Sequence, residues 1–341
     1  MAFAPYGSEV RMPYVDTETT REETTDAATD EPYIPGGIFS ETPRAVADPK
    51  KVLPMPVDTD ICVNDDKDTV ADDKTETTET APEPVPEYNI PAYPADSAAV
   101  GLCVNGKEMP HGFAANVGGV LFFPLDDFCG LFGDVSSRND EAGYTVFGDG
   151  FEVTVNVGEK YIGSRGRVLW GGGAEVIDLD GTICVPAEPL CRAMGLELVA
   201  QGDAATVTGE AMSGSADEVY DADGLYWLSH IISAESRGEP LEGQMAVGCV
   251  VLNRLKKLDY LSSIYEVVFD RRYGIQFSPA YSGSVYSEPT ESCIRAAKMC
   301  LEGYSVSDSI MYFINSADTP PAWMVNGCKL IITIGHHDFY A

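Results

Sequence analysis

Apolar residues recur at helical spacing in the first half of residues 220–341 and in short extended runs near the end. In ADGLYWLSHIISAES, Leu225, Leu228 and Ile232 fall on one face of a helix. The pattern predicts three helices, at residues 222–236, 242–257 and 289–302. Two extended apolar runs follow, at residues 309–314 and 330–334. Residues 220–341 are therefore predicted to form an α+β domain with its helices first.

Glycine and proline mark the ends of these predicted helices. Gly238 and Pro240 end the first helix, because proline has no amide hydrogen to donate and glycine is favoured just beyond a helix. Pro289 is expected in the first turn of the third helix, and Gly303 just after its last turn.

Residues 99–212 contain an internal repeat with an offset of 62 residues. GVLFFPLDDFCGLFG at 119–133 aligns with GTICVPAEPLCRAMG at 181–195, so that proline, cysteine and glycine recur at matching places. In each copy a short apolar strand ends at proline, and an amphipathic helix then runs to a glycine. Alternating stretches such as FEVTVNV follow, which is typical of half-buried strands. The segment is predicted to be β-rich, with a strand–helix–strands unit used twice.

Residues 1–98 are predicted to be a disordered acidic arm. Stretches such as DTETTREETTDAATDE consist of Thr, acidic residues and Pro with few large apolar side chains, so they cannot bury enough surface to offset chain entropy. EPVPEYNIPAYP favours extended polyproline II. We expect a solvated linker rather than a docking arm, and no partner for the arm can be identified.

Charge narrows the range of partners. The chain carries a net charge of −32, of which −15 belongs to residues 1–98 and only −5 to residues 220–341. A DNA or RNA partner is excluded by repulsion, whereas the nearly balanced C-terminal part suits an approach to an anionic polymer. No apolar run has the ~20 residues of a membrane helix. The start resembles no secretory signal, so either the protein acts where it is made or its natural start lies upstream.

Nine cysteines occur without a C-x-x-C pair, which excludes zinc ribbons and thioredoxin-like motifs. We interpret them as buried, reduced cysteines that pack as small apolar residues.

The middle segment resembles the copper amine oxidase N-terminal-like stalk domain of bacterial envelope proteins. VNGKEM at Val104–Met109 and the strand–Pro–helix–Gly runs after it carry the resemblance. The resemblance implies a non-catalytic spacer or binding module at residues 99–212. His111 is the only histidine in this segment, so a copper site has no set of ligands.

The C-terminal segment resembles the SleB/CwlJ family of spore cortex-lytic cell wall hydrolases. AESRGEP at Ala234–Pro240 is followed by GQMAV and VLNR in the order of that family. Further matching runs follow, namely IYEVVF at 264–269, QFS at 276–278, YFIN at 312–315 and IGHHDFY at 334–340. The resemblance covers residues 220–341. It implies a lysozyme-like fold and cleavage of the β-1,4 bond between N-acetylmuramic acid and N-acetylglucosamine, with 1,6-anhydro ends as in lytic transglycosylases.

Glu235 is the expected general acid and later base. It lies near the end of an apolar helix, and a partly buried carboxyl stays protonated to higher pH. Glu239 lies four residues on, where a continuing helix would place both carboxylates on one face and repulsion would raise one pKa further. Gly238 and Pro240 interrupt that geometry, so Glu239 is assigned a supporting role. A transglycosylase needs no second carboxylate, because the substrate supplies the nucleophile.

Other residues of the motifs are candidates for substrate contact or support. Gln276 and Asn315 offer amides that bond acetamido and hydroxyl groups, and Tyr312 offers an aromatic face for a sugar. Arg237 is expected to pair with a carboxylate and hold the loop after Glu235. Three further aromatic residues are interpreted as structural, namely Phe277, Phe313 and His337.

Three rival functions remain at this stage. A zinc amidase needs three ligands, and His230, His336 and His337 are a poor set because the last two are adjacent. A cysteine peptidase would use Cys249 or Cys328, for which no orienting group is evident. A non-catalytic envelope or spore-coat protein that binds peptidoglycan is the main alternative, although it has no need of an intact AESRGEP. We expect peptidoglycan as partner, no cofactor or metal, and a place in the cell envelope, the spore cortex or coat, or outside the cell.

Overall fold

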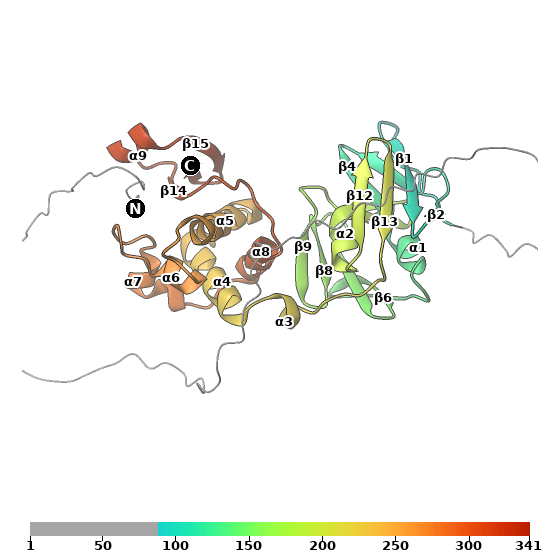
Figure 1. Ribbon diagram of the computed structural model, residues 1–341, viewed down its shortest axis with the longest axis horizontal. Helices are drawn as coiled ribbons and strands as arrows, with labels where there is room; N and C mark the ends of the chain where they lie inside the picture. Colours follow the sequence, from blue (N-terminus) through green and yellow to red (C-terminus); the bar gives the residue numbers. More distant parts are fainter. Residues whose placement is uncertain (1–87) are drawn as a thin grey trace, which may run out of the picture. The chain divides into compact units, whose positions relative to one another are not determined.

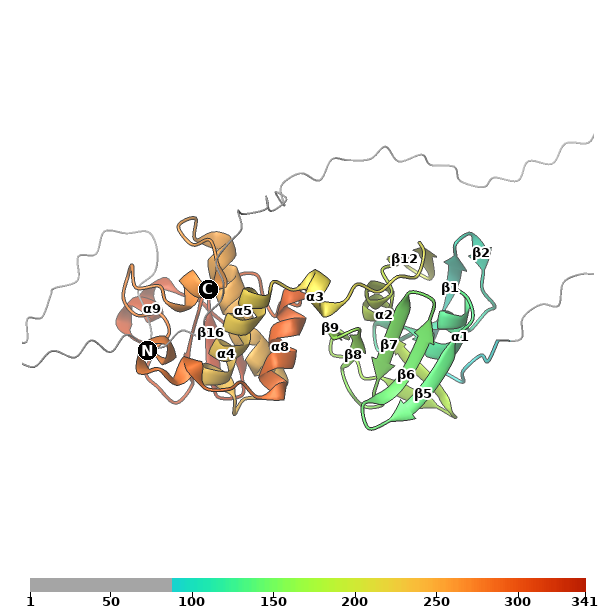
Figure 2. The same cartoon turned by 90° about the horizontal axis from the view of Figure 1, so that it is seen from below.

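Two β-sheets form between Ala98 and Thr208 in the computed structural model, which describes residues 88–341 (Figure 1). Their strands are β1 (Ala98–Val104), β2 (Lys107–Glu108), β3 (Ala114–Val117), β4 (Val120–Pro124), β5 (Ser136–Asp140), β6 (Gly143–Gly148), β7 (Phe151–Val155), β8 (Tyr161–Ser164), β9 (Arg167–Trp170), β10 (Ile177–Leu179), β11 (Thr182–Pro186), β12 (Glu197–Gln201) and β13 (Ala204–Thr208). The larger sheet has the order β10-β11-β4-β3-β1-β13-β12, with β2 paired to β1. The smaller has the order β5-β6-β7-β8-β9, of which β5, β6 and β7 lie side by side in Figure 2. The predicted β-rich character is confirmed.

The two halves of the sequence repeat meet in the larger sheet. Strands β4 and β11 pair antiparallel, and each leads directly into a helix, α1 (Leu125–Gly130) or α2 (Ala187–Ala193). Proline precedes each helix, and Gly133 and Gly195 beyond them have φ values of +130° and +70°. The strand–helix units thus form as the sequence predicted, because proline ends the ladder and glycine accepts a left-handed turn. The duplication itself and the stalk resemblance stay predictions.

The described end of the predicted arm contacts the β-rich part. Asn89 Nδ2 donates to Thr182 Oγ1 at 2.7 Å, and the Tyr88 ring meets that of Phe113 edge-on at 5.4 Å. The rest of the predicted disordered arm, residues 1–87, lies outside the described residues. The boundaries predicted at residues 98, 212 and 220 stay predictions.

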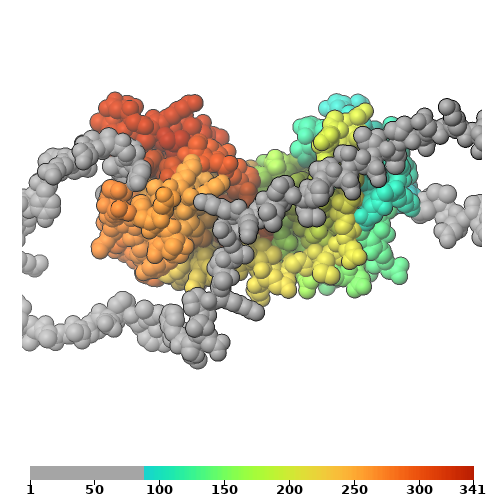
Figure 3. Space-filling view, in the orientation of Figure 1, coloured from blue at the N-terminus to red at the C-terminus, as the bar shows by residue number. Residues whose placement is uncertain are grey.

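Residues 216–341 build a helical part with a small antiparallel sheet. Its elements are α3 (Ala216–Val219), α4 (Ala222–Ser236), α5 (Leu241–Lys257), α6 (Ile264–Val268), α7 (Pro279–Ser282), the 3₁₀ helix η1 (Ser284–Tyr286), α8 (Glu291–Leu301), α9 (Ala322–Gly327), and strands β14 (Tyr312–Asn315), β15 (Leu330–Ile334) and β16 (His337–Tyr340). Helices α4, α5 and α8 pack against one another (Figures 1 and 2). The sheet has the order β14-β16-β15 and packs against α5. Its residues belong to the red region of the space-filling view in Figure 3. The predicted α+β class with helices first is confirmed, whereas the lysozyme-like fold stays a prediction.

The first two predicted helices are found with nearly the predicted bounds, and the third starts later than expected. Helix α8 begins at Glu291, so Pro289 lies outside its first turn. Thr290 is the N-cap, because its Oγ1 accepts a hydrogen bond from the Cys293 amide. Gly303, with φ of +95°, follows the helix as predicted. No helix among residues 88–341 is both long and apolar enough to cross a membrane.

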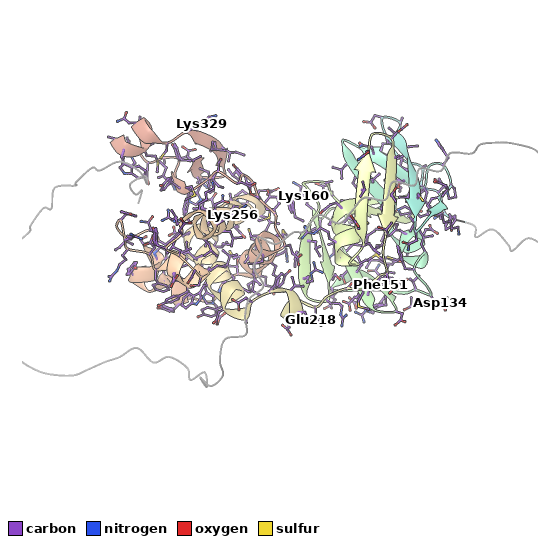
Figure 4. All side chains as sticks on the ribbon, viewed as in Figure 1. Asp134, Phe151, Lys160, Glu218, Lys256 and Lys329 are labelled. Atoms are coloured by element: carbon purple, nitrogen blue, oxygen red, sulfur yellow. The ribbon has the colours of Figure 1, made fainter. Side chains whose placement is uncertain are left out.

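A buried ion pair joins strand β9 to the end of helix α8. Both carboxylate oxygens of Glu302 accept from Arg167, at 2.7 Å each, and Tyr220 donates to the same carboxylate at 2.8 Å. These hydrogen bonds hold the pKa of Glu302 below its usual value although burial alone would raise it. Nearby, Lys160, labelled in Figure 4, reaches Glu242 of α5 at 3.2 Å. The two parts of the described chain therefore share a specific polar contact.

Candidate active site

Glu235 lies on the last turn of α4. The helix begins where the Asp221 carboxylate accepts a hydrogen bond from the Gly224 amide at 2.7 Å. Its apolar face, which includes Ile231 and Ile232, is fully buried against the helical core. That burial fixes the rotation of α4 about its axis, so the apolar residues just before Glu235 determine the direction in which its side chain leaves the helix.

The carboxyl group of Glu235 is half-buried and has no polar partner among residues 88–341, where no hydrogen bond or ion pair to it occurs. Burial disfavours its charged form and raises its pKa from the ordinary 4.5 to about 7. Glu235 therefore has the property that a proton donor to a glycosidic oxygen needs near neutral pH.

Glu239 is in a contrasting environment. Its Oε2 accepts from the His336 amide at 2.7 Å and its Oε1 contacts His336 Nδ1 at 3.1 Å. Burial acts to raise the pKa of Glu239, but the hydrogen bonds from His336 outweigh it and the pKa is lowered. The chain leaves the helical path after Ser236, so the expected shared helix face and mutual repulsion of the two carboxylates are not found. Glu239 fastens the α4–α5 connection to the β15–β16 turn.

Arg237 does not make the carboxylate pair that the sequence predicted. Its side chain turns back along α4, where Nε donates to the Ser233 carbonyl at 3.2 Å and Nη2 to Ser233 Oγ at 3.1 Å. The physical reason is that carbonyls of the last helical turn lack helical partners and accept from a nearby guanidinium. Arg237 thus braces the turn that carries Glu235.

Gln244 is a supporting residue to which the sequence assigned no role. Its Nε2 donates to the Glu239 carbonyl at 2.9 Å, while its Oε1 accepts from Ser292 Oγ at 2.8 Å. The side chain is buried and ties the start of α5 to α8. The GQMAV run was the available signal, but its partner Ser292 is 48 residues away and leaves no local pattern.

Gln276 lies in the loop between α6 and α7. Its amide nitrogen donates to the Gly274 carbonyl at 2.9 Å, so the side chain is used in part to shape its own loop. The start of this loop is anchored at Asp270, which accepts from Tyr260 at 3.0 Å and from the buried Arg254 at 3.5 Å. The described contacts include none between Gln276 and Glu235.

Tyr312 and Asn315 are at opposite ends of β14. The Tyr312 ring packs edge-on to Trp323 at 5.5 Å, and the Arg254 guanidinium lies 5.9 Å from its centre. Asn315 is exposed, its Oδ1 accepts from the Ala317 amide at 2.9 Å, and it stands opposite His337 in the sheet.

The candidate residues thus form two groups. Asn315 lies beside the Glu239–His336 contact, because the next amide, that of Ser316, donates to the His336 carbonyl at 2.8 Å. Gln276 and Tyr312 are both linked to the pair formed by Arg254 and Asp270, because the Gln276 backbone amide donates to the Asp270 carbonyl and the Arg254 guanidinium lies over the Tyr312 ring.

Phe277 and Phe313 are structural, as predicted. Phe277 is buried, and Phe313 is partly buried and packs on Phe277 and Phe339. His337 is buried between aromatic rings, and burial lowers its pKa. Its Nδ1 is buried and has no hydrogen-bond partner among residues 88–341, and its ring packs against aromatic neighbours, in agreement with the structural interpretation.

The residues of the rival enzymes are separated. His230 Nδ1 is bonded to the Val285 carbonyl at 2.8 Å, whereas His336 engages Glu239. Among residues 88–341 no three His, Cys, Asp or Glu side chains are placed to hold a metal ion. Cys249 is buried in the helical core, in agreement with its apolar interpretation. The eight described cysteines are free thiols.

Comparisons with known proteins bear on the C-terminal part. The family model of the cell wall hydrolases matches residues 238–340. The spore cortex-lytic enzyme of Bacillus subtilis is 32% identical over 114 residues, which are 33% of this chain and 35% of that enzyme. The spore cortex-lytic enzyme of Oceanobacillus iheyensis is 28% identical over 138 residues, 40% of this chain and 49% of that enzyme. This chain therefore spans half or less of the length of these relatives.

A solved structure is also similar. The catalytic domain of the germination-specific lytic transglycosylase SleB from Bacillus anthracis is 27% identical, with a TM-score of 0.32, and the match covers 36% of this chain and 97% of that domain. The family match begins at Gly238 and so does not test the stalk-like resemblance of residues 99–212. Residues 238–340 are thus similar to the cell wall hydrolase family, as the motifs of the C-terminal segment predicted.

Proposed function

We propose that this protein cleaves the glycan strands of bacterial peptidoglycan at the β-1,4 bond between N-acetylmuramic acid and N-acetylglucosamine. The observation that carries the proposal is the contrast between two neighbouring carboxyl groups. Glu235 has its pKa raised to about 7, whereas both oxygens of Glu239 are held by His336 and its pKa is lowered. A pair of groups whose environments separate their pKa values is typical of an acid–base assignment.

In this mechanism protonated Glu235 donates its proton to the glycosidic oxygen as the bond to the muramic C1 breaks. The C6 hydroxyl of the same muramic residue then attacks C1, and the Glu235 carboxylate accepts the hydroxyl proton. The products are a free N-acetylglucosamine 4-hydroxyl and a 1,6-anhydromuramic end, so atoms and protons balance and Glu235 returns to its acid form. Glu239 is not free to activate a water molecule, which favours this intramolecular route over hydrolysis.

The supporting residues keep Glu235 in place. Arg237 and Gln244 secure the ends of α4 and α5 around it, and Glu239 ties their connection to the β15–β16 turn. Gln276, Tyr312 and Asn315 are the proposed substrate contacts. The similarity to spore cortex-lytic enzymes supports action at the spore cortex or elsewhere in the cell envelope.

The test is the chemistry of the released fragments. The full chain is incubated with purified cortical and vegetative sacculi, and the soluble muropeptides are analysed by mass spectrometry. Products one water lighter than reducing muropeptides are expected. Reducing muramic ends would make the protein a hydrolase, free peptides would make it an amidase, and no release from either wall would leave only a binding function.

A further inference from the structure

Exposed tyrosines gather around Trp227 on the helical part of the molecule. Tyr226 on α4, Tyr265 on α6 and Tyr286 on η1 are 43%, 47% and 57% exposed. Their ring centres lie 4.9, 5.1 and 6.0 Å from that of Trp227, and Phe269 lies 5.3 Å from it. Three separate elements, of which α6 and η1 each pack on α4, thus present one aromatic surface, defined here as the Trp227 platform.

The rings of the platform pack on neighbouring residues. Tyr226 stacks on His230 at 4.0 Å, and His230 Nδ1 is bonded to the carbonyl of the buried Val285, next to Tyr286. Tyr265 follows the N-cap Ser263, whose Oγ accepts from the Glu266 amide. These contacts restrict the rings before any ligand binds, which lowers the side-chain entropy that binding would cost.

The chemistry of the platform suits a glycan. Pyranose rings with equatorial substituents present flat faces of C–H groups, which pack on exposed aromatic faces. A contiguous cluster of large aromatic rings that leaves apolar area in water is typical of a binding surface.

The platform lies partly on the helix that carries Glu235. Trp227 is eight residues before Glu235 on α4, a separation of about 12 Å along the helix axis. On its other side Phe269 packs on Tyr281 at 6.2 Å, just beyond the loop that carries Gln276. A glycan strand bound at Glu235 therefore has Trp227 within the length of a few sugar residues along α4.

We propose that the Trp227 platform binds the peptidoglycan glycan strand at sugars outside the bond that is cut. The inference rests on the proposed function, because it takes the same polymer as ligand. Its effect is to retain the enzyme on long strands, so it acts on affinity for the wall and not on the chemical step.

Binding is measured separately from cleavage to test this. The full chain carrying Glu235→Gln is sedimented with glycan strands freed of their peptides by an amidase. Adding Tyr265→Ala and Tyr286→Ala is expected to weaken binding at least tenfold. The matched pair Tyr265→Phe and Tyr286→Phe keeps the ring faces and is expected to stay within twofold. Circular dichroism and thermal melts establish that each variant is folded, and Tyr286→Ala alone, at the most exposed position, serves if the double variant is not.

Several outcomes would overturn the platform. Unchanged sedimentation of the alanine variant would do so, even if wild-type cleavage succeeds and the proposed function stands. Loss of self-association in the alanine variant, with glycan binding intact, would assign the surface to a second copy of the chain. Displacement of the strand by a synthetic peptide of residues 83–94 would assign it to that Pro-rich segment. A chain that binds strands through the platform but never cleaves them would instead refute the proposed function.

Discussion

A charge placed near Glu235 should shift the pH dependence of cleavage. Gly238 is three residues after Glu235 and exposed, and no atom lies within 4 Å of the Cβ that a side chain there would add. Gly238→Lys therefore brings an ammonium near the carboxyl without a clash, and Gly238→Gln is the neutral control of similar length. Opposite charge within reach favours the carboxylate and lowers its pKa by about one unit at an exposed site.

The size of the effect follows from the pKa of about 7. The acid form is about 90% populated at pH 6, half at pH 7 and about 10% at pH 8, so activity is present at low pH and lost as pH rises through 7. A pKa near 6 in Gly238→Lys leaves its rate within about twofold of the control at pH 5.5 but about eightfold lower at pH 7.5.

Initial rates of turbidity loss of purified sacculi, taken every half pH unit from 5 to 9, measure the alkaline limb of each variant. Gly238→Gln should share the wild-type midpoint near 7. The reasoning is refuted if the lysine and glutamine variants have the same midpoint, or if wild-type activity already falls near pH 4.5 as for an ordinary glutamate.

Three further changes have defined expectations. Because the pKa of Glu235 is raised in the folded protein, its contribution to stability is present below pH 4.5 and lost as the pH rises through 7. The free energy of unfolding of Glu235→Gln, from thermal melts, should match that of wild type at pH 4.5 and exceed it by about 2–3 kcal/mol at pH 8. A gain independent of pH would contradict this. Gly335→Ala places a Cβ 2.0 Å from Glu239 Oε2, at a backbone φ of +58°, and should lower both the melting temperature and the cleavage rate. Unchanged values would show that the contact between Glu239 and the β15–β16 turn is dispensable. Arg167→Met leaves the Glu302 carboxylate buried without its main partner and should lower the free energy of unfolding, measured by urea titration, by about 2–4 kcal/mol. Adding Glu302→Met should restore part of that stability, and no restoration would mean that the loss has another cause.

Local patterns predicted the elements that carry the site. The apolar spacing of residues 222–236 predicted α4 with the bounds that the structure has, and a single proline misplaced the start of α8 because Thr290 is the better cap. Glu235 was expected as the acid from the AESRGEP resemblance and from its apolar helix. Burial raises its pKa, as that setting predicted, while its catalytic role stays a prediction.

Contacts between residues far apart in the chain could not be predicted from the sequence. Glu239 meets His336 across 97 positions, and Arg167 meets Glu302 across 135. Neither partner is identified by spacing or composition, because a long-range pair is fixed only when the whole core has packed. Arg237 was mispredicted for a local reason. Its guanidinium donates to the nearby Ser233 carbonyl instead of the carboxylate that its charge led us to expect.

The central claim is that Glu235 supplies the proton. The most direct test compares Glu235→Gln with Glu242→Gln, a carboxylate of the next helix that is bound to Lys160, on the same sacculi at pH 6. Loss of a general acid costs about 10²–10⁴ in rate, so Glu235→Gln should release almost no muropeptide while Glu242→Gln stays within about twofold of wild type. Release of anhydromuropeptides by folded Glu235→Gln at a rate near that of wild type would contradict the account.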